Sequence, residues 1–164
     1  MLVAAVLPLL IVAACQRQAP DEQVAQEKAA DLVSAFAMAD PQAAAQITHG
    51  FHGLENGWRW VASKFGVTLA PPEGSAAQLE LKFALPAAVS DRMGAVTLSA
   101  TVNGKPLEPE TFKTAGNQVY TRDVGMVGPG PITIEFSTDK ALPPGNGDAR
   151  ELALIVTRVS LLAK

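Results

Sequence analysis

Two short clusters of aromatic and charged residues have the types and spacing that binding or catalysis would need. The candidate residues are Glu55, Trp58, Arg59, Trp60, Asp148, Arg150 and Glu151. Indole rings can stack on sugar rings, guanidinium groups pair with carboxylates, and two carboxylates at a suitable separation can hydrolyse a glycosidic bond. The clusters therefore indicate a sugar-binding edge, a hydrolytic pair or a structural network.

The two tryptophans share one face if their segment is a strand. Trp58 and Trp60 then project from one side and Arg59 from the other. We expect the shared face to be the core, because tryptophan is usually well buried and the chain has only two. In the alternative, two exposed indoles form a stacking platform for sugar rings.

Arg59 would then need a carboxylate on its own side of the strand. Glu151 or Asp148 can supply it if the first and last strands are neighbours. Such an arginine–carboxylate network would act as a clasp between the two ends of the domain. The functional version of the same cluster is a polar sugar-binding edge, and Glu55 could belong to either version.

The same clusters resemble a known module. A β-sandwich that accompanies bacterial polysaccharide glycosyltransferases, or stands alone in envelope proteins, has a Glu and a Trp-Arg-Trp near its start. It has an Asp-x-Arg-Glu-Leu near its end, which is similar to residues 148–152 here, although Ala153 stands where the module has glycine. The resemblance covers residues 50–164 and implies a sandwich with a carbohydrate-related role. It does not by itself imply catalysis.

Catalytic and metal-binding signatures are otherwise weak. The chain has no Gly-x-Ser-x-Gly elbow and no glycine-rich phosphate loop of the usual kinds. His49, His52 and Glu55 are three apart and could be metal ligands on a helical turn, but neighbouring glycines disfavour a rigid helix. We expect a solvated loop there, and no metal or cofactor. The alternative function is an envelope glycan hydrolase that uses Glu55 with Asp148 or Glu151.

Cys15 points to the membrane. It is the only cysteine and follows fourteen uncharged, mostly apolar residues that end in Val12-Ala13-Ala14. This resembles the lipobox of bacterial lipoproteins, which implies that residues 1–14 are a signal peptide and that the Cys15 thiol carries lipid. Residues 15–22 would be a lipid-anchored tether. Gln16, rather than aspartate, follows the cysteine, so by analogy we expect the outer membrane, facing the periplasm.

The overall charge argues against one class of partner. The 164 residues carry a formal charge of −3, and the lysines and arginines are scattered, so no basic stripe can hold a nucleic acid backbone. We therefore expect a non-enzymatic envelope lipoprotein whose sandwich binds an envelope polysaccharide or a protein partner.

The pattern of apolar residues changes along the chain. Apolar residues three or four apart predict an amphipathic helix over residues 21–38, and a helical turn over 42–47, within a lead segment of residues 23–48. Beyond it, strict alternation predicts strands over 79–85, 96–102 and 132–136, with a tight turn at Asn103-Gly104. The apolar positions change parity near Thr157-Arg158, which predicts a β-bulge. The predicted fold is mainly β, an antiparallel, jelly-roll-like β-sandwich over residues 49–164.

Overall fold

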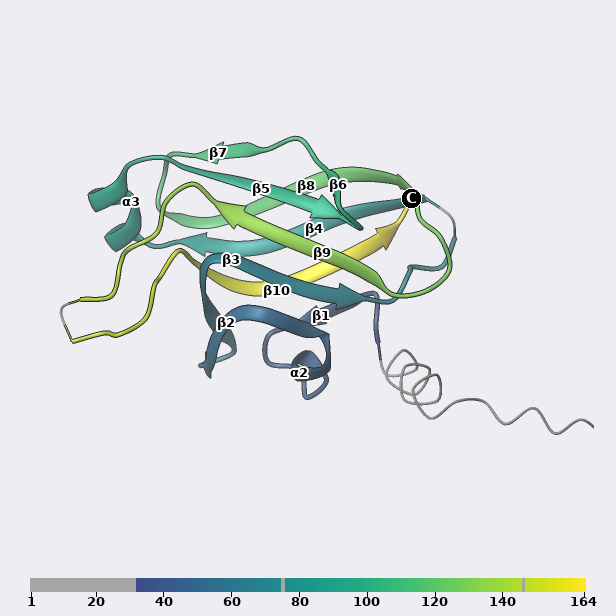
Figure 1. Ribbon diagram of the computed structural model, residues 1–164, viewed down its shortest axis with the longest axis horizontal. Coiled ribbons are helices and arrows are strands. Elements are labelled where there is room, and N and C mark those ends of the chain that lie inside the picture. The colour runs from purple at the N-terminus through teal and green to yellow at the C-terminus, as the bar shows by residue number, and fades with distance from the viewer. Residues whose placement is uncertain (1–31, 75, 146) are drawn as a thin grey trace, which may run out of the picture.

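The fold is a single curled antiparallel sheet (Figure 1). A computed structural model describes residues 32–74, 76–145 and 147–164. The strands are β1 (Ala35–Ala37), β2 (Ile47–Glu55), β3 (Trp58–Leu69), β4 (Ala76–Leu85), β5 (Val96–Val102), β6 (Lys105–Pro106), β7 (Glu110–Phe112), β8 (Gly116–Met126), β9 (Ile132–Thr138) and β10 (Leu154–Ala163). The helices are α2 (Ala43–Gln46) and α3 (Ala87–Met93). Cys15, the signal segment and the tether lie outside the described residues.

The strand order explains the curl. The main path is β6-β5-β9-β3-β10-β4-β8, while β7 pairs with β5, β2 with β3 and β1 with β10. The edge strand β8 is joined to the opposite end of the path by side chains: the Tyr120 hydroxyl donates to the Glu108 carbonyl at 2.8 Å, and Arg122 Nε donates to the same oxygen at 2.7 Å. The mainly β, antiparallel fold that the alternation predicts is confirmed.

The core lies inside the curl and is built from alternate positions of each strand. Leu79, Leu81 and Phe83 of β4 are buried, as are Ile134 and Phe136 of β9. The rings of Phe65 on β3 and Phe136 stack with their centroids 4.9 Å apart. The intervening polar positions of these strands face outward, which is the expected arrangement when one face of an antiparallel sheet is solvated.

The predicted bulge in the last strand is confirmed, and it has a structural role. The pairing of β10 with β4 shifts between Val156 and Arg158. On its other edge, β10 pairs with β3 through residues 154–156 and with β1 through residues 158–160. The bulge therefore marks the point where the neighbour of β10 changes from β3 to β1. At the bulge, the Thr157 carbonyl accepts a hydrogen bond from the Met38 amide at 2.9 Å.

The predicted helix over residues 21–38 is wrong in its described part. Residues 35–37 form β1, and Phe36 is 1% exposed and pairs with Val159 of β10. Met38 is also buried, so the burial here has a period of two. Helix propensity amounts to a fraction of a kcal/mol per residue, whereas burying one large apolar side chain contributes about 1.5–3 kcal/mol. Burial of these side chains therefore makes the segment a strand in spite of its helix propensity.

Three local expectations can be compared directly with the structure. The turn at Asn103 and Gly104 is confirmed by positive φ angles of 48° and 78°, and α2 confirms the helical turn expected over residues 42–47. The segment expected to be a solvated loop is instead strand β2, which pairs with β3 through several register shifts. Within the described ranges, no helix is long and apolar enough to cross a membrane.

Candidate functional site

A tight hairpin between β2 and β3 positions the two tryptophans. Asn56 and Gly57 form its turn with positive φ angles of 48° and 87°, as a two-residue hairpin of type I′ requires. Glu55 and Trp58 flank the turn and are direct cross-strand partners. Because such partners share a face, the turn places a carboxylate beside an indole.

Trp58 and Trp60 are partly exposed, so the expectation that both lie in the core is wrong. They contact each other edge to face, with ring centroids 6.4 Å apart and an interplanar angle of 80°. The next residue of β3, Val61, is fully buried and faces the core, so the two indoles project from the opposite face of the strand. Trp60 also packs against the margin of the core, where its partner on β10 is Ile155. The pair, which we call the indole surface, lies on the outer face of β3.

Arg150, and not Arg59, is the cation of the predicted clasp. Arg150 Nη1 lies 2.6 Å from Glu55 Oε1, and its Nη2 lies 2.8 Å from Asp148 Oδ2. Its Nε donates to Asp148 Oδ1 at 3.0 Å, so the Asp148 contact is bidentate. We call these three residues the Arg150 network. It joins the β2–β3 hairpin to the loop that precedes β10, across 95 residues of sequence.

Arg59 is excluded from the network by the alternation of β3. Its cross-strand partner is Leu54, on the face opposite to Glu55 and Trp58. Arg59 Nη1 donates to the His52 carbonyl at 2.9 Å, and its Nε is buried without a hydrogen bond to any described residue. Within the described part of the chain Arg59 has no ion pair, so the predicted pairing with Glu151 or Asp148 is wrong.

Glu151 performs a separate task. Its Oε1 accepts a hydrogen bond from the Ser63 amide on β3 at 2.8 Å, and its carbonyl oxygen lies 2.8 Å from His52 Nε2 on β2. These contacts fasten the segment before β10 to both strands of the hairpin. The hydrogen bond from Ser63 lowers the pKa of the Glu151 carboxyl. Glu151 is therefore an ionised anchor for the backbone.

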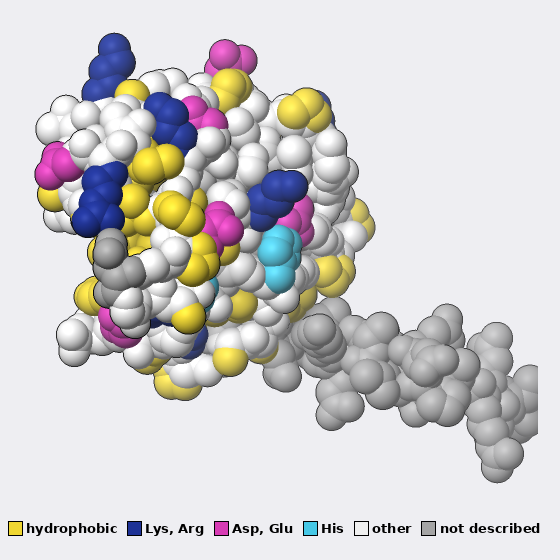
Figure 2. All heavy atoms as spheres, turned by 60° about the vertical axis from the view of Figure 1, so that its left-hand side comes forward, with side chains coloured by type: hydrophobic (Ala, Val, Ile, Leu, Met, Phe, Trp, Pro, Cys, Tyr) yellow, Lys and Arg dark blue, Asp and Glu magenta, His cyan; other side chains and the backbone are white. Residues whose placement is uncertain are grey.

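The ion pairs keep the network charged. The hydrogen bonds from Arg150 lower the pKa of Asp148 to about 2, and those to Asp148 and Glu55 raise the pKa of Arg150. Each of the three side chains is only about one third exposed, at 34–37%. This end of the molecule is turned toward the viewer in Figure 2, where hydrophobic side chains lie among acidic and basic ones. The site thus combines aromatic rings with fixed charges.

The possible metal ligands do not come together. His49 Nε2 pairs with Glu135 Oε2 at 3.1 Å, His52 contacts the Glu151 carbonyl, and Glu55 contacts Arg150. Each of the three side chains on the irregular strand β2 therefore has a different partner. Among the residues with described positions, no three histidine, cysteine or acidic side chains form a group that could hold a metal ion.

Sequence reasoning considered His49 only as a metal ligand and missed the cluster of polar side chains to which it belongs. His49, Lys64, Glu135 and Ser137 line a hollow on the outer face of the sheet. The residues of β9 alternate visibly in the sequence, but the register of three strands is needed to bring these side chains together. Only the strand pairing shows that Lys64 lies opposite Ser137.

Comparisons with known proteins establish no family. No protein-family model matches the chain, and no curated protein matches it. Similar solved structures include the CBM36-1 domain of a multidomain xylanase from the hindgut metagenome of Trinervitermes trinervoides. It has 10% identity and a TM-score of 0.48, over 79% of this chain and 96% of that one.

Two further solved structures are similar at the same level. The family 35 carbohydrate-binding module from Clostridium thermocellum has 17% identity and a TM-score of 0.48, over 79% of this chain and 98% of that one. The carbohydrate-binding module CBM36 in complex with calcium and xylotriose has 10% identity and a TM-score of 0.42, over 79% and 99% of the two chains. Such identities and scores are too low to assign a ligand to this chain.

Proposed function

We propose that this chain is a lipid-anchored protein of the cell envelope whose β-sandwich binds a glycan at the indole surface. The observation that carries the proposal is the placement of two partly exposed, edge-to-face indoles beside the Arg150 network. A sugar ring has an apolar face of C–H groups and a rim of hydroxyl groups. A site for it needs aromatic surface together with a few well-placed polar groups, and this surface has both.

The polar half of the site is held in position before any ligand arrives. Glu55 and Asp148 offer carboxylate oxygens that can accept hydrogen bonds from sugar hydroxyls, while Arg150 holds both carboxylates through its guanidinium. The network is anchored at two points, the hairpin turn and the loop before β10. Less side-chain entropy is lost on binding when the polar groups are already fixed, which favours binding by this surface.

The ionisation of Asp148 and Glu151 makes both poor proton donors for glycoside hydrolysis. A glycosidase needs one carboxylic acid with a raised pKa to protonate the leaving oxygen. Here the pKa of Asp148 is lowered to about 2 and that of Glu151 is lowered as well. Glu151 is also occupied by the Ser63 amide. Both groups are therefore suited to accept hydrogen bonds, and neither is suited to give up a proton.

Affinity gel electrophoresis of the full chain in detergent micelles, with embedded envelope polysaccharides, tests the site. We expect Trp58→Ala and Trp60→Ala each to weaken retardation by roughly two- to tenfold, the usual effect of one aromatic contact. Val119→Ala is the matched control, because Val119 is 48% exposed on β8, away from the indoles. The proposal is refuted if both tryptophan variants are retarded as strongly as Val119→Ala. It is also refuted if no envelope polysaccharide retards the wild-type protein.

The membrane anchor is the second part of the proposal, and it is supported by the sequence around Cys15 alone. The residues before Leu32 lie outside the described part of the chain. Metabolic labelling with a palmitate analogue should mark the wild-type protein and leave Cys15→Ala unlabelled. Because Gln16 follows the cysteine, we propose the outer membrane as its location, which fractionation of labelled cells can test.

A further inference from the structure

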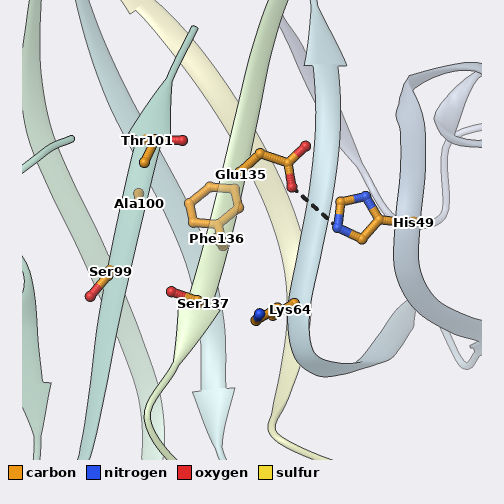
Figure 3. A pocket seen from close by; sticks show the side chains of 8 residues that line it. All are labelled: His49, Lys64, Ser99, Ala100, Thr101, Glu135, Phe136 and Ser137. Carbon is orange, nitrogen blue, oxygen red and sulfur yellow. Dashed lines mark ion pairs between the residues drawn. The ribbon is translucent and has the colours of Figure 1, made fainter. Parts of the chain in front are cut away.

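A second polar site lies on the outer face of β3, β9 and β5. It is a hollow of about 170 Å³ (Figure 3). The strand register arranges its side chains in two rows. Ser99, Ser137 and Lys64 lie side by side in the first row, and Thr101 and Glu135 lie side by side in the second. Phe136 and Ala100 are buried and complete the lining.

The hollow offers hydrogen-bond donors that the protein leaves unused. The hydroxyls of Ser99, Ser137 and Thr101 form no hydrogen bond with any described residue, and the Lys64 ammonium has neither a hydrogen bond nor an ion pair there. Neighbouring side chains behave differently, since Thr97 and Thr111 bond to each other at 2.9 Å across β5 and β7. Three hydroxyls and one cation are therefore free to contact a ligand in the hollow.

The second row is closed on one side by His49. Its Nε2 lies 3.1 Å from Glu135 Oε2, and its Nδ1 contacts the Thr48 hydroxyl at 3.2 Å. Gly66 makes room for this ring, because a Cβ there would lie 2.7 Å from His49 Cε1 and 2.7 Å from Glu135 Oε1. The contact with His49 fixes the Glu135 carboxylate at the upper rim of the hollow in Figure 3, above Lys64. The hollow thus has a fixed acceptor at one end and a free cation at the other.

We propose that this hollow binds one sugar residue that carries a carboxylate. The carboxylate pairs with the Lys64 ammonium, and the ring hydroxyls donate to Glu135 and accept from the serine and threonine hydroxyls. Glu135 repels a simple anion such as phosphate, whereas a ligand with an anionic group at one end and hydroxyls at the other satisfies both rows. Pockets for drug-sized ligands measure about 300–1,000 Å³, so the smaller hollow suits a single ring.

This site is distinct from the indole surface. Lys64 is four residues beyond Trp60 on β3, which is about 13 Å along an extended strand. None of the residues that line the hollow belongs to the indole surface or to the Arg150 network. The inference therefore does not rest on the proposed function, and the two sites can be tested with separate variants.

Backbone amide NMR of the isotope-labelled full chain in detergent micelles tests the inference. The probes are D-glucuronate, D-glucose and inorganic phosphate. We expect glucuronate to shift the amide signals of Lys64, Ser99 and Ser137 in a saturable manner, and glucose and phosphate to bind at least fivefold more weakly. Lys64→Gln should weaken glucuronate binding by roughly five- to tenfold, as expected for the loss of one charge-assisted hydrogen bond.

Two controls make the outcome decisive. Lys113→Gln removes another exposed lysine, outside the hollow, and should leave glucuronate binding unchanged. Trp60→Ala should also leave it unchanged, which separates this site from the indole surface. The inference is overturned if glucuronate shifts none of the three amides, if glucose or phosphate binds as tightly, or if Lys64→Gln binds glucuronate like the wild type.

Discussion

Replacing Gly50 by alanine should separate β2 from β3 and destabilise the fold. Gly50 has a φ of +76°, and a Cβ placed there would lie 2.0 Å from the Lys64 carbonyl oxygen and 2.6 Å from Phe65 Cα. Both of these atoms are backbone atoms of β3, so no side-chain rotation can relieve the contact. The two strands must instead move apart where Phe51 packs edge to face on Phe65.

The expected magnitude has two parts. A left-handed backbone costs a residue with a Cβ about 1–2 kcal/mol, and forcing extra atoms into a packed region costs about 1–3 kcal/mol. Together they lower the free energy of unfolding by roughly 2–5 kcal/mol. A typical domain has about 5–15 kcal/mol of stability, so the variant should fold but unfold at a clearly lower urea concentration.

Gly53 provides a matched control on the same strand. A Cβ at Gly53 would meet no atom within 4 Å, and its φ is not in the left-handed region. Gly53→Ala should therefore change the free energy of unfolding by about 0.5 kcal/mol or less. Urea unfolding of chains that begin at Gln16, followed by tryptophan fluorescence, measures both variants. Equal urea midpoints for Gly50→Ala and Gly53→Ala would refute the close approach of β2 to β3.

Three further outcomes can be measured on the same chains. Phe36→Ala should lower the free energy of unfolding by about 3–5 kcal/mol, because β1 places this ring in the core; a loss below 1 kcal/mol would show that residues 35–37 are not a core strand. The Asp148 pKa of about 2 lies below its ordinary value of 3.8, so the ion pair stabilises the fold above pH 3.8 and this contribution is lost as the pH falls toward 2. Asp148→Asn should flatten that part of the stability curve, and an unchanged curve would contradict the pairing. Arg150→Gln should speed amide hydrogen exchange in the loop before β10 and leave exchange in β4 unaffected. If the substitution changes the exchange rates of the loop and of β4 equally, the network does not anchor the loop.

Strands β4, β5 and β9 and the bulge in β10 could be predicted from the sequence because their causes are local. Alternation of apolar and polar side chains marks β4, β5 and β9, since one face of each strand is buried. The parity change at Thr157 and Arg158 predicts the bulge for the same reason: only an extra residue keeps both halves of β10 facing the core. Asn103 and Gly104 tolerate positive φ angles, and they form the turn.

The sequence by itself determined strands β4, β5 and β9, the bulge of β10 and the turn at Asn103 and Gly104, because backbone preference and one-sided burial act over a few neighbouring residues. Only the tertiary structure decided which other segments join the sheet and which side chains come together on it. It made residues 35–37 a strand, because β10 had a free edge beyond its bulge. It chose Arg150 over Arg59, because Glu55 and Arg59 lie on opposite faces of the hairpin. It also assembled the Lys64 hollow, since contacts between strands far apart in sequence depend on register, which no single strand encodes.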